Sequence, residues 1–115
     1  MKKQATKKVA LPPEIKEQVE ELVEKFNRQT FKGDPNYYFV ARYRGDSVFF
    51  DMCKYGRLGP RCRLKYCGQM DNWEFAICKY SRNNYDPDEW FFPGSNHVNG
   101  TVEGALQAGL EAYPV

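Results

Sequence analysis

The feature that most constrains this chain is an alternation of apolar and polar residues on both sides of Gly45-Asp46. The flanking runs are YYFVARYR and SVFFDMCK. Period-two alternation predicts two half-buried strands, and glycine in the first position of a two-residue loop is typical of a type II′ hairpin turn. With Arg44 opposite Ser47, one face of the hairpin collects the apolar side chains. These are Tyr37, Phe39, Ala41, Tyr43, Val48, Phe50 and Met52.

A second antiparallel pair is predicted from RCRLKY and NWEFAICKY, which follow a turn around GRLGP and are joined by a loop at residues 68–71. In this register the core pairs are Tyr66 with Trp73, Leu64 with Phe75, and Cys62 with Ile77. Lys65 then faces Glu74 on the opposite side, a favourable cross-strand charge pair. A shift of one residue would expose the aromatic residues, so the pattern selects this register.

Helices are predicted on either side of these strands. Residues 12–29 carry apolar residues at helical spacing, and residues 101–113 do so again, with Thr101 as the N-cap. Residues 81–100 are rich in turn formers, with a short edge strand expected at 89–92. We therefore predict an α+β domain with an antiparallel meander of four to five strands and both helices on its apolar face. Residues 1–11 are expected to form a flexible basic tail, and residues 12–115 a single domain.

Composition restricts the class of protein further. A chain of 115 residues suits one domain, and its N-terminus has no apolar run long enough for a signal peptide. No stretch is long and apolar enough to span a membrane. We therefore expect a cytoplasmic protein with reduced thiols. Charge is segregated: residues 33–82 hold nine Lys or Arg against five Asp or Glu, whereas residues 83–115 hold five acids and no Lys or Arg.

The four cysteines are spaced C-x8-C-x4-C-x10-C, without the closely spaced pairs that structural zinc sites use. Strand parity directs Cys62 into the core and places Cys53, Cys67 and Cys78 outside it. The thiols are therefore predicted to be packing residues, and we expect neither a metal nor a cofactor. Nothing in the spacing sets His97, the single histidine, beside a particular cysteine, so no catalytic thiol is predicted.

The sheet face opposite the helices, called the outer face below, is predicted to mix cations with aromatic rings. This mixture occurs at protein interfaces and on single-stranded nucleic-acid platforms. The leading hypothesis is a non-enzymatic binding module that uses this face for a protein partner or for self-association as a homodimer. Single-stranded nucleic acid is the alternative ligand. The candidate binding residues are Tyr38, Arg42, Arg44, Phe49, Tyr55, Arg61, Arg63 and Lys65.

A second alternative comes from a different class. The long connection YDPDEWFFPGSNHVNGT gathers carboxylates around the histidine, a combination that could hold a divalent metal or act as acid and base. Its candidate residues are Asp86, Asp88, Glu89 and His97. The same segment is also explained by turn formation, since Asp-Pro-Asp and Asn-Gly both favour turns. An enzyme or metal site therefore stays the weaker hypothesis.

From Asp46 onward, the spacing of GDSVFFD, RLKYCGQMDNWEFAICKY and the Trp and Tyr residues after them resembles a group of small prokaryotic proteins of unknown function. Members of that group share a helix, a meander with a Trp-rich late strand and no assigned activity. The resemblance implies a bacterial or archaeal α+β domain. Its motifs are structural aromatic residues, so it implies no catalytic residue, cofactor or partner.

Overall fold

The computed structural model describes residues 10–81 and 84–115, and within them it contains two α-helices, one 3-10 turn and five strands. In chain order these are α1 (Pro13–Phe31), β2 (Tyr37–Arg44), β3 (Ser47–Lys54), β4 (Arg57–Tyr66), β5 (Trp73–Lys79), β6 (Asn84–Asp86), η1 (Ser95–His97) and α2 (Val102–Ala112). The strands form one antiparallel sheet in the order β2-β3-β4-β5-β6.

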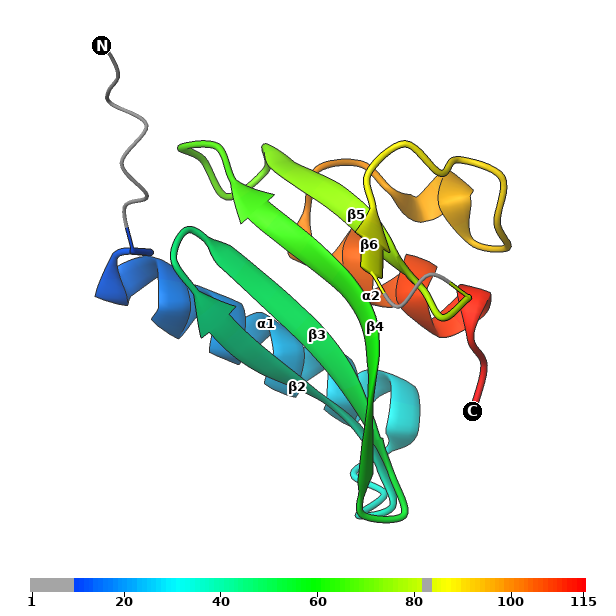
Figure 1. The fold of residues 1–115 in the computed structure, drawn as a ribbon. Coiled ribbons are helices and arrows are strands. Elements are labelled where there is room, and N and C mark those ends of the chain that lie inside the picture. Colours follow the sequence, from blue (N-terminus) through cyan, green and yellow to red (C-terminus); the bar gives the residue numbers. More distant parts are fainter. Residues whose placement is uncertain (1–9, 82–83) are drawn as a thin grey trace, which may run out of the picture.

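Both helices lie on the same side of the sheet, with α1 behind β2 and β3 and α2 behind β4 and β5 (Figure 1). The predicted α+β architecture is confirmed. The core lies between these two layers and is built from the inward-facing side chains of the strands and the apolar stripes of the helices. Its largest fully buried members include Phe39, Phe50, Met52, Leu64, Ile77 and Leu106. No helix in residues 10–81 and 84–115 combines the length and apolar character needed to cross a membrane.

Helix α1 begins after Pro12, with Pro13 in its first turn, where a missing N–H costs no hydrogen bond. It ends where Lys32 and Gly33 adopt positive φ angles of 56° and 76°. The predicted tail at residues 1–11 falls mostly on residues 1–9, which lie outside the described residues. Its last member was misplaced, because Leu11 is buried in the core and its N–H donates to Gly45 O at 3.1 Å.

The first hairpin has the predicted turn and register. Gly45 has a φ of 60° and Asp46 is not among the residues with positive φ, as a type II′ turn requires. Arg44 faces Ser47, and the pairs Tyr43–Val48, Ala41–Phe50 and Phe39–Met52 follow without a shift. The register between β4 and β5 is also as predicted, including the Lys65–Glu74 pair.

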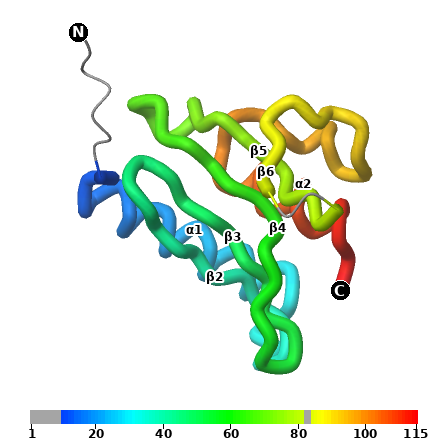
Figure 2. Tube along the Cα trace, in the orientation of Figure 1, coloured from blue at the N-terminus to red at the C-terminus, as the bar shows by residue number. Residues whose placement is uncertain are grey.

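The connection between β3 and β4 differs from the prediction. The chain turns at Tyr55-Gly56, both with positive φ (52° and 81°), which is the type I′ pattern. Residues 57–60 therefore do not form the turn but begin β4. Figure 2 shows β3 and β4 running side by side past β5 and β6 to this tight turn.

In the C-terminal part of the chain, the predicted helix is confirmed and the predicted edge strand lies at other residues. Thr101 caps α2 by accepting a hydrogen bond from Gly104 N at 3.0 Å. The edge strand expected at residues 89–92 is instead β6, at Asn84–Asp86, which pairs with the last residues of β5. Because β6 is so short, it protects only part of the β5 edge.

Candidate interaction site on the outer sheet face

The strand registers arrange the outer face in transverse rows. One row runs from Arg42 through Phe49 to Arg63 and ends at Ala76, and the next runs from Arg44 through Ser47 to Lys65 and Glu74. A third row contains Val40, Asp51, Pro60, Cys78 and Tyr85. Cations therefore gather at the Gly45-Asp46 end of the face, whereas the third row brings together small and aromatic side chains.

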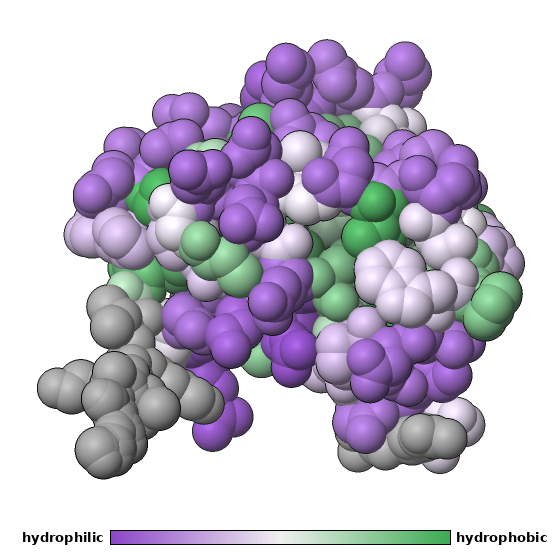
Figure 3. Space-filling model, turned by 90° about the horizontal axis from the view of Figure 1, so that it is seen from above, coloured by the Kyte–Doolittle hydropathy of each residue, from purple (hydrophilic) through white to green (hydrophobic). Residues whose placement is uncertain are grey.

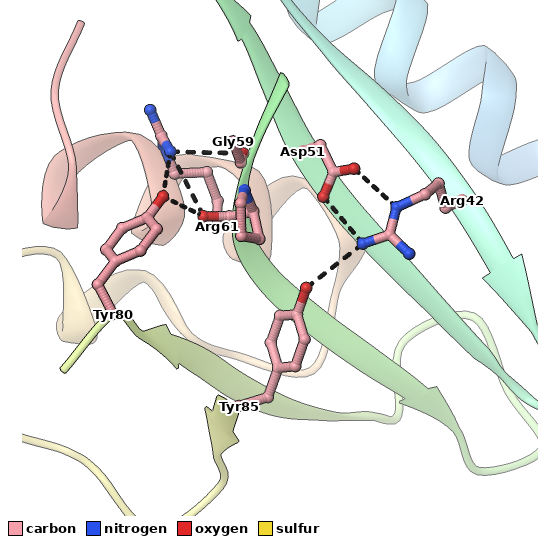
Figure 4. Close-up of polar contacts among 7 residues, drawn as sticks. Arg42, Asp51, Gly59, Arg61, Tyr80 and Tyr85 are labelled. Atoms are coloured by element: carbon pink, nitrogen blue, oxygen red, sulfur yellow. Dashed lines mark hydrogen bonds and ion pairs between the residues drawn. The ribbon is translucent and has the colours of Figure 1, made fainter. Parts of the chain in front are cut away.

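The third row is covered, although it lies on the face away from the helices. Asp51 is only 5% exposed and Cys78 only 3%. The ring of Tyr85, from the short edge strand β6, lies 5.2 Å from the ring of Phe49 on β3, and its hydroxyl accepts a 3.4 Å hydrogen bond from Arg42. Figure 4 shows Tyr85 pointing toward Arg42 and Asp51. This part of the face is a packed layer, and burial raises the pKa of Tyr85.

Arg42 and Asp51 form a two-pronged ion pair within this layer (Figure 4). The guanidinium Nε and Nη2 lie 2.7 and 3.1 Å from the two carboxylate oxygens. The hydrogen bond to Asp51 raises the pKa of Arg42. The guanidinium also lies 5.0 Å from the centre of the Phe49 ring. Both the charge of Arg42 and one side of Phe49 are therefore engaged within the protein.

Arg61 was predicted on the outer face and lies on the opposite one. Phe50 pairs with Cys62 and Asp51 with Pro60, so Arg61 is the extra residue of a β-bulge and loses the alternating parity of the strand. A side chain at Gly109 of α2 would meet the Arg61 Cβ at 3.4 Å, which places Arg61 on the helix side. The residue is only 9% exposed, and its Nη1 donates to Tyr80 Oη at 2.6 Å.

Two predicted aromatic binding residues lie away from the cations. Tyr55 was expected on the outer face of a strand, but it occupies the hairpin turn, where it packs edge-on against Tyr37 at 5.2 Å. Tyr38 is on the outer face, 37% exposed, in the row of Cys53 and Leu58. A hydrogen bond with the Cys53 thiol raises the pKa of its hydroxyl.

The remaining cations form what we call the basic patch, defined as Arg44, Arg63 and Lys65 around the half-buried edge of Phe49. Arg44 and Lys65 are exposed and Arg63 is half-buried. The Nε of Arg63 is buried, and within the described residues it has no hydrogen-bond partner. Asp51 is already paired with Arg42. The two rows that contain the basic patch hold one acidic residue, Glu74, which the register places beside Lys65. The patch therefore keeps a positive excess.

Three of the four thiols are packing residues, and Cys67 is exposed. All four cysteines are free, and three of them are buried. Burial raises the pKa of the Cys62 thiol, whose sulfur lies 3.6 Å from the carbonyl oxygen of Ala105. Burial likewise raises the pKa values of Cys67 and Cys78. Thiolate is the reactive form, so these shifts work against nucleophilic chemistry at neutral pH.

The four candidate residues of the acidic connection divide among three separate contacts. Asp86 accepts a hydrogen bond from the backbone of Asp88 in a local turn, and Glu89 pairs with Lys79 at 3.4 Å. His97 points away to α2, where its Nε2 lies 2.7 Å from a Glu111 oxygen. Among residues 10–81 and 84–115, no three His, Cys, Asp or Glu side chains converge as metal ligands would.

The same connection borders a hollow of about 390 Å³ beside the part of β5 that β6 leaves uncovered. Its walls are largely apolar and include Trp73, Phe75, Trp90 and Val98. Figure 3, which views the molecule from above, shows apolar and weakly polar surface around a hollow between hydrophilic rims. The loop residues Trp90 and Phe91 are 52% and 92% exposed.

A comparison with models of protein families, with curated proteins and with solved structures finds no match. The resemblance to the prokaryotic group of unknown function therefore stays a prediction, and function has to be argued from the geometry of this chain alone.

Proposed function

We propose that this chain is a non-enzymatic interaction module whose basic patch binds an acidic segment of a partner protein. The observation that carries the proposal is the alignment of Arg44, Arg63 and Lys65 by strand register, next to an aromatic residue, while the neighbouring cation Arg42 is already neutralised by Asp51. Carboxylate side chains on a partner would complement these cations, and Phe49 supplies apolar contact area. Mixed aromatic and arginine surfaces of this kind are typical of protein interfaces.

The same geometry favours a protein over single-stranded nucleic acid. A nucleic-acid platform needs aromatic faces open for base stacking beside the cations. Here Arg42 and Tyr85 pack against Phe49, while Tyr55 sits in a distant turn. Arg61, one of the five cations expected to hold phosphates, lies on the helix side. Self-association through the patch is also disfavoured, because a two-fold axis at the patch would bring like charges together.

The experiment compares two labelled probes by fluorescence anisotropy at about 50 mM salt, where surface electrostatics are only partly screened. One probe is a ten-residue peptide alternating Glu and Val, and the other is a ten-nucleotide oligothymidine. We expect the peptide to bind and the oligonucleotide to bind more weakly. The double variant Arg63→Glu/Lys65→Glu should abolish binding of the peptide.

A matched control keeps net charge constant between variants. Lys25→Glu/Arg28→Glu makes the same charge change on the exposed side of α1, and it should leave peptide binding within about twofold of the native chain. Equal losses in both double variants would show non-specific attraction and overturn the proposal. Tighter binding of the oligonucleotide would favour the nucleic-acid alternative, and sedimentation at several concentrations would detect a homodimer.

A further inference from the structure

The edge strand β2 is covered at its ends and open in its middle. The side chain of Asn27, from α1, donates to the carbonyl oxygen of Phe39 at 3.0 Å and accepts from the Phe39 N–H at 2.8 Å. It therefore satisfies both backbone groups of Phe39, as a neighbouring strand would. At the other end of the strand, Gly45 O accepts a hydrogen bond from Leu11 N.

Strand geometry shows which backbone groups of β2 between Phe39 and Gly45 face away from the sheet. In an antiparallel pair, a residue that directs its N–H and C=O off the sheet alternates with one that directs both toward the neighbouring strand. Phe39 belongs to the first kind, and the β2–β3 register has no shift. Ala41 and Tyr43 therefore present four backbone groups to the open side. No partner for them is found within residues 10–81 and 84–115.

A groove of about 410 Å³ runs along this open edge. Its strand side is made by Phe39, Val40 and Ala41, and its helix side by α1 residues Glu20, Val23, Glu24 and Asn27. The α1 side is acidic, and its Glu20 already accepts a hydrogen bond from the Tyr43 hydroxyl at 2.6 Å. On the outer side of β2, Arg42 is paired with Asp51 and Arg44 is exposed, so an added strand would meet carboxylates on one face and the cation of Arg44 on the other.

We infer that the middle of β2 binds an extended peptide segment of a partner protein by β-strand addition, with Lys or Arg side chains toward Glu20 and Glu24 and an Asp or Glu side chain toward Arg44. Strand addition gains affinity from main-chain hydrogen bonds and specificity from alternate side chains. Because Asn27 holds the backbone of Phe39 and Leu11 bonds to Gly45, the new pairing is limited to a short stretch around Ala41 and Tyr43. This inference goes beyond the basic patch, because it depends on backbone groups and on α1.

A second copy of the chain fits this edge less well than such a peptide. Pairing the open position Ala41 with Tyr43 of another copy would set Arg42 directly opposite Arg42 of that copy. Like charges directly opposite on paired strands are destabilising. Exposed strand edges tend to be extended by other chains, and in this register, which uses the open positions Ala41 and Tyr43 of both copies, the charges select against self-pairing.

The test uses the full chain and a synthetic peptide, Lys-Glu-Val-Glu-Lys-Glu-Val with blocked ends, whose Lys and Val side chains share one face when it is extended. Amide hydrogen exchange followed by NMR should show fast exchange at Ala41 and Tyr43 in the free chain and slow exchange with peptide. A peptide of the same sequence, N-methylated at alternate amides, should bind at least about tenfold more weakly because it cannot complete the ladder.

Two variants separate pairing from general attraction. Ala41→Pro removes one outward N–H at an edge position where proline is tolerated, and it should weaken peptide binding at least about tenfold. Asn27→Ala releases both Phe39 groups, and it should strengthen binding about fivefold, the equivalent of one net hydrogen bond. Arg63→Glu/Lys65→Glu should leave the slow exchange of the Ala41 and Tyr43 amides with peptide in place, because these amides lie outside the basic patch, and this readout distinguishes the edge from the patch.

Any one of four results for the monomeric chain would overturn the inference. These are no binding of the unmodified peptide at about 1 mM, equal binding of the N-methylated peptide, equal binding by Ala41→Pro, and slow exchange at Ala41 and Tyr43 in the free monomer. The last would mean that the chain itself already occupies the edge. Protection that appears only as the chain dimerises would identify a second copy as the occupant and would also overturn it.

Discussion

Arg61 Nη1 lies 2.6 Å from the hydroxyl oxygen of Tyr80, and this contact ties the bulge in β4 to the end of β5. The guanidinium also lies 5.6 Å from the ring of Tyr113, whose hydroxyl donates to Cys78 O at 2.6 Å. The rings of Tyr80 and Tyr113 meet edge-on at 4.9 Å. Arg61 therefore joins the sheet to the C-terminal end of α2, where a cation also suits the helix dipole.

This placement predicts that two arginines expected on the same face differ in their effect on stability. Arg61→Ala should lower the free energy of unfolding by about 2 kcal/mol or more, because it empties a buried site between the sheet and α2 and removes the hydrogen bond that the Tyr80 hydroxyl accepts, leaving only the one it donates to Pro60 O. Arg44→Ala, at an exposed position of β2, should change it by less than about 0.5 kcal/mol. Urea denaturation of both variants is the measurement. Equal, small effects would place Arg61 back on the surface.

The bulge explains why the sheet was predictable and one of its key side chains was not. Alternation and turn chemistry specify register, because a slip of one residue would expose Trp73 or Phe75. Counting alternate residues assigns side chains to the two faces of a strand. Where the strand contains an unrecognised extra residue, that count gives the wrong face. The signal was present in Gly59-Pro60, since proline within a central strand is typical of a bulge. The same residues are also typical of a turn.

The covering of the outer face could not be predicted for a different reason. Strand β6 is only three residues long, and NYD within a turn-rich segment carries no periodic pattern. Its Tyr85 nevertheless reaches Phe49 and Arg42. The Arg42–Asp51 pair is easier to anticipate, because register brings Arg42 beside Phe49 and Asp51 beside Val40 on the same face. Which cations stay unpaired depends on such three-dimensional contacts.

Two glycines of α2 should respond in opposite ways to alanine. A Cβ at Gly104 would overlap the carbonyl oxygen of His97 and the side chain of Asn99, so Gly104→Ala should cost about 1–3 kcal/mol through overpacking. A Cβ at Gly109 would meet Arg61 and Cys62 at 3.4 and 3.5 Å, ordinary contact distances. Gly109→Ala should therefore be neutral or stabilise by up to about 1 kcal/mol. Thermal unfolding of both variants checks this, and a destabilising Gly109→Ala would contradict it.

The turn between β3 and β4 should be improved by asparagine. Tyr55 has a φ of 52°, an uncommon value for an aromatic residue, and Asn-Gly is the preferred pair for a type I′ turn. Tyr55→Asn should raise the free energy of unfolding by about 0.5–1 kcal/mol. Loss of the ring contact between Tyr55 and Tyr37 would reduce this gain. Tyr55→Phe is the control, since it keeps the ring and the strain, and it should leave the midpoint of urea unfolding unchanged.

Cys67 should react with a thiol reagent faster than the other three cysteines. Cys67 is exposed, whereas Cys53, Cys62 and Cys78 are buried. We expect one thiol per native chain to react with an aromatic disulfide reagent, and four in guanidinium chloride. Because the pKa of Cys67 is raised, its reaction at pH 7 should be slower than that of free cysteine. Cys67→Ser should remove the fast reaction, and a second reactive thiol in the native chain would contradict the buried positions.

Acid stability should depend on Glu111. The Gln107 amide donates to its carboxylate at 3.0 Å and, with the His97 contact, lowers the pKa of Glu111 against the opposing effect of burial. A carboxyl group with a lower pKa when folded stabilises the protein above its unfolded pKa, and this contribution is lost as the pH falls through the folded value. The difference in free energy of unfolding between the native chain and Glu111→Gln should therefore shrink below about pH 4. Gln107→Ala should weaken this pH dependence, whereas Gln18→Ala on exposed α1 surface should not. Urea titrations between pH 3 and 7 provide the measurement, and a constant difference across that range would show that the Gln107–Glu111 contact does not stabilise the folded carboxylate.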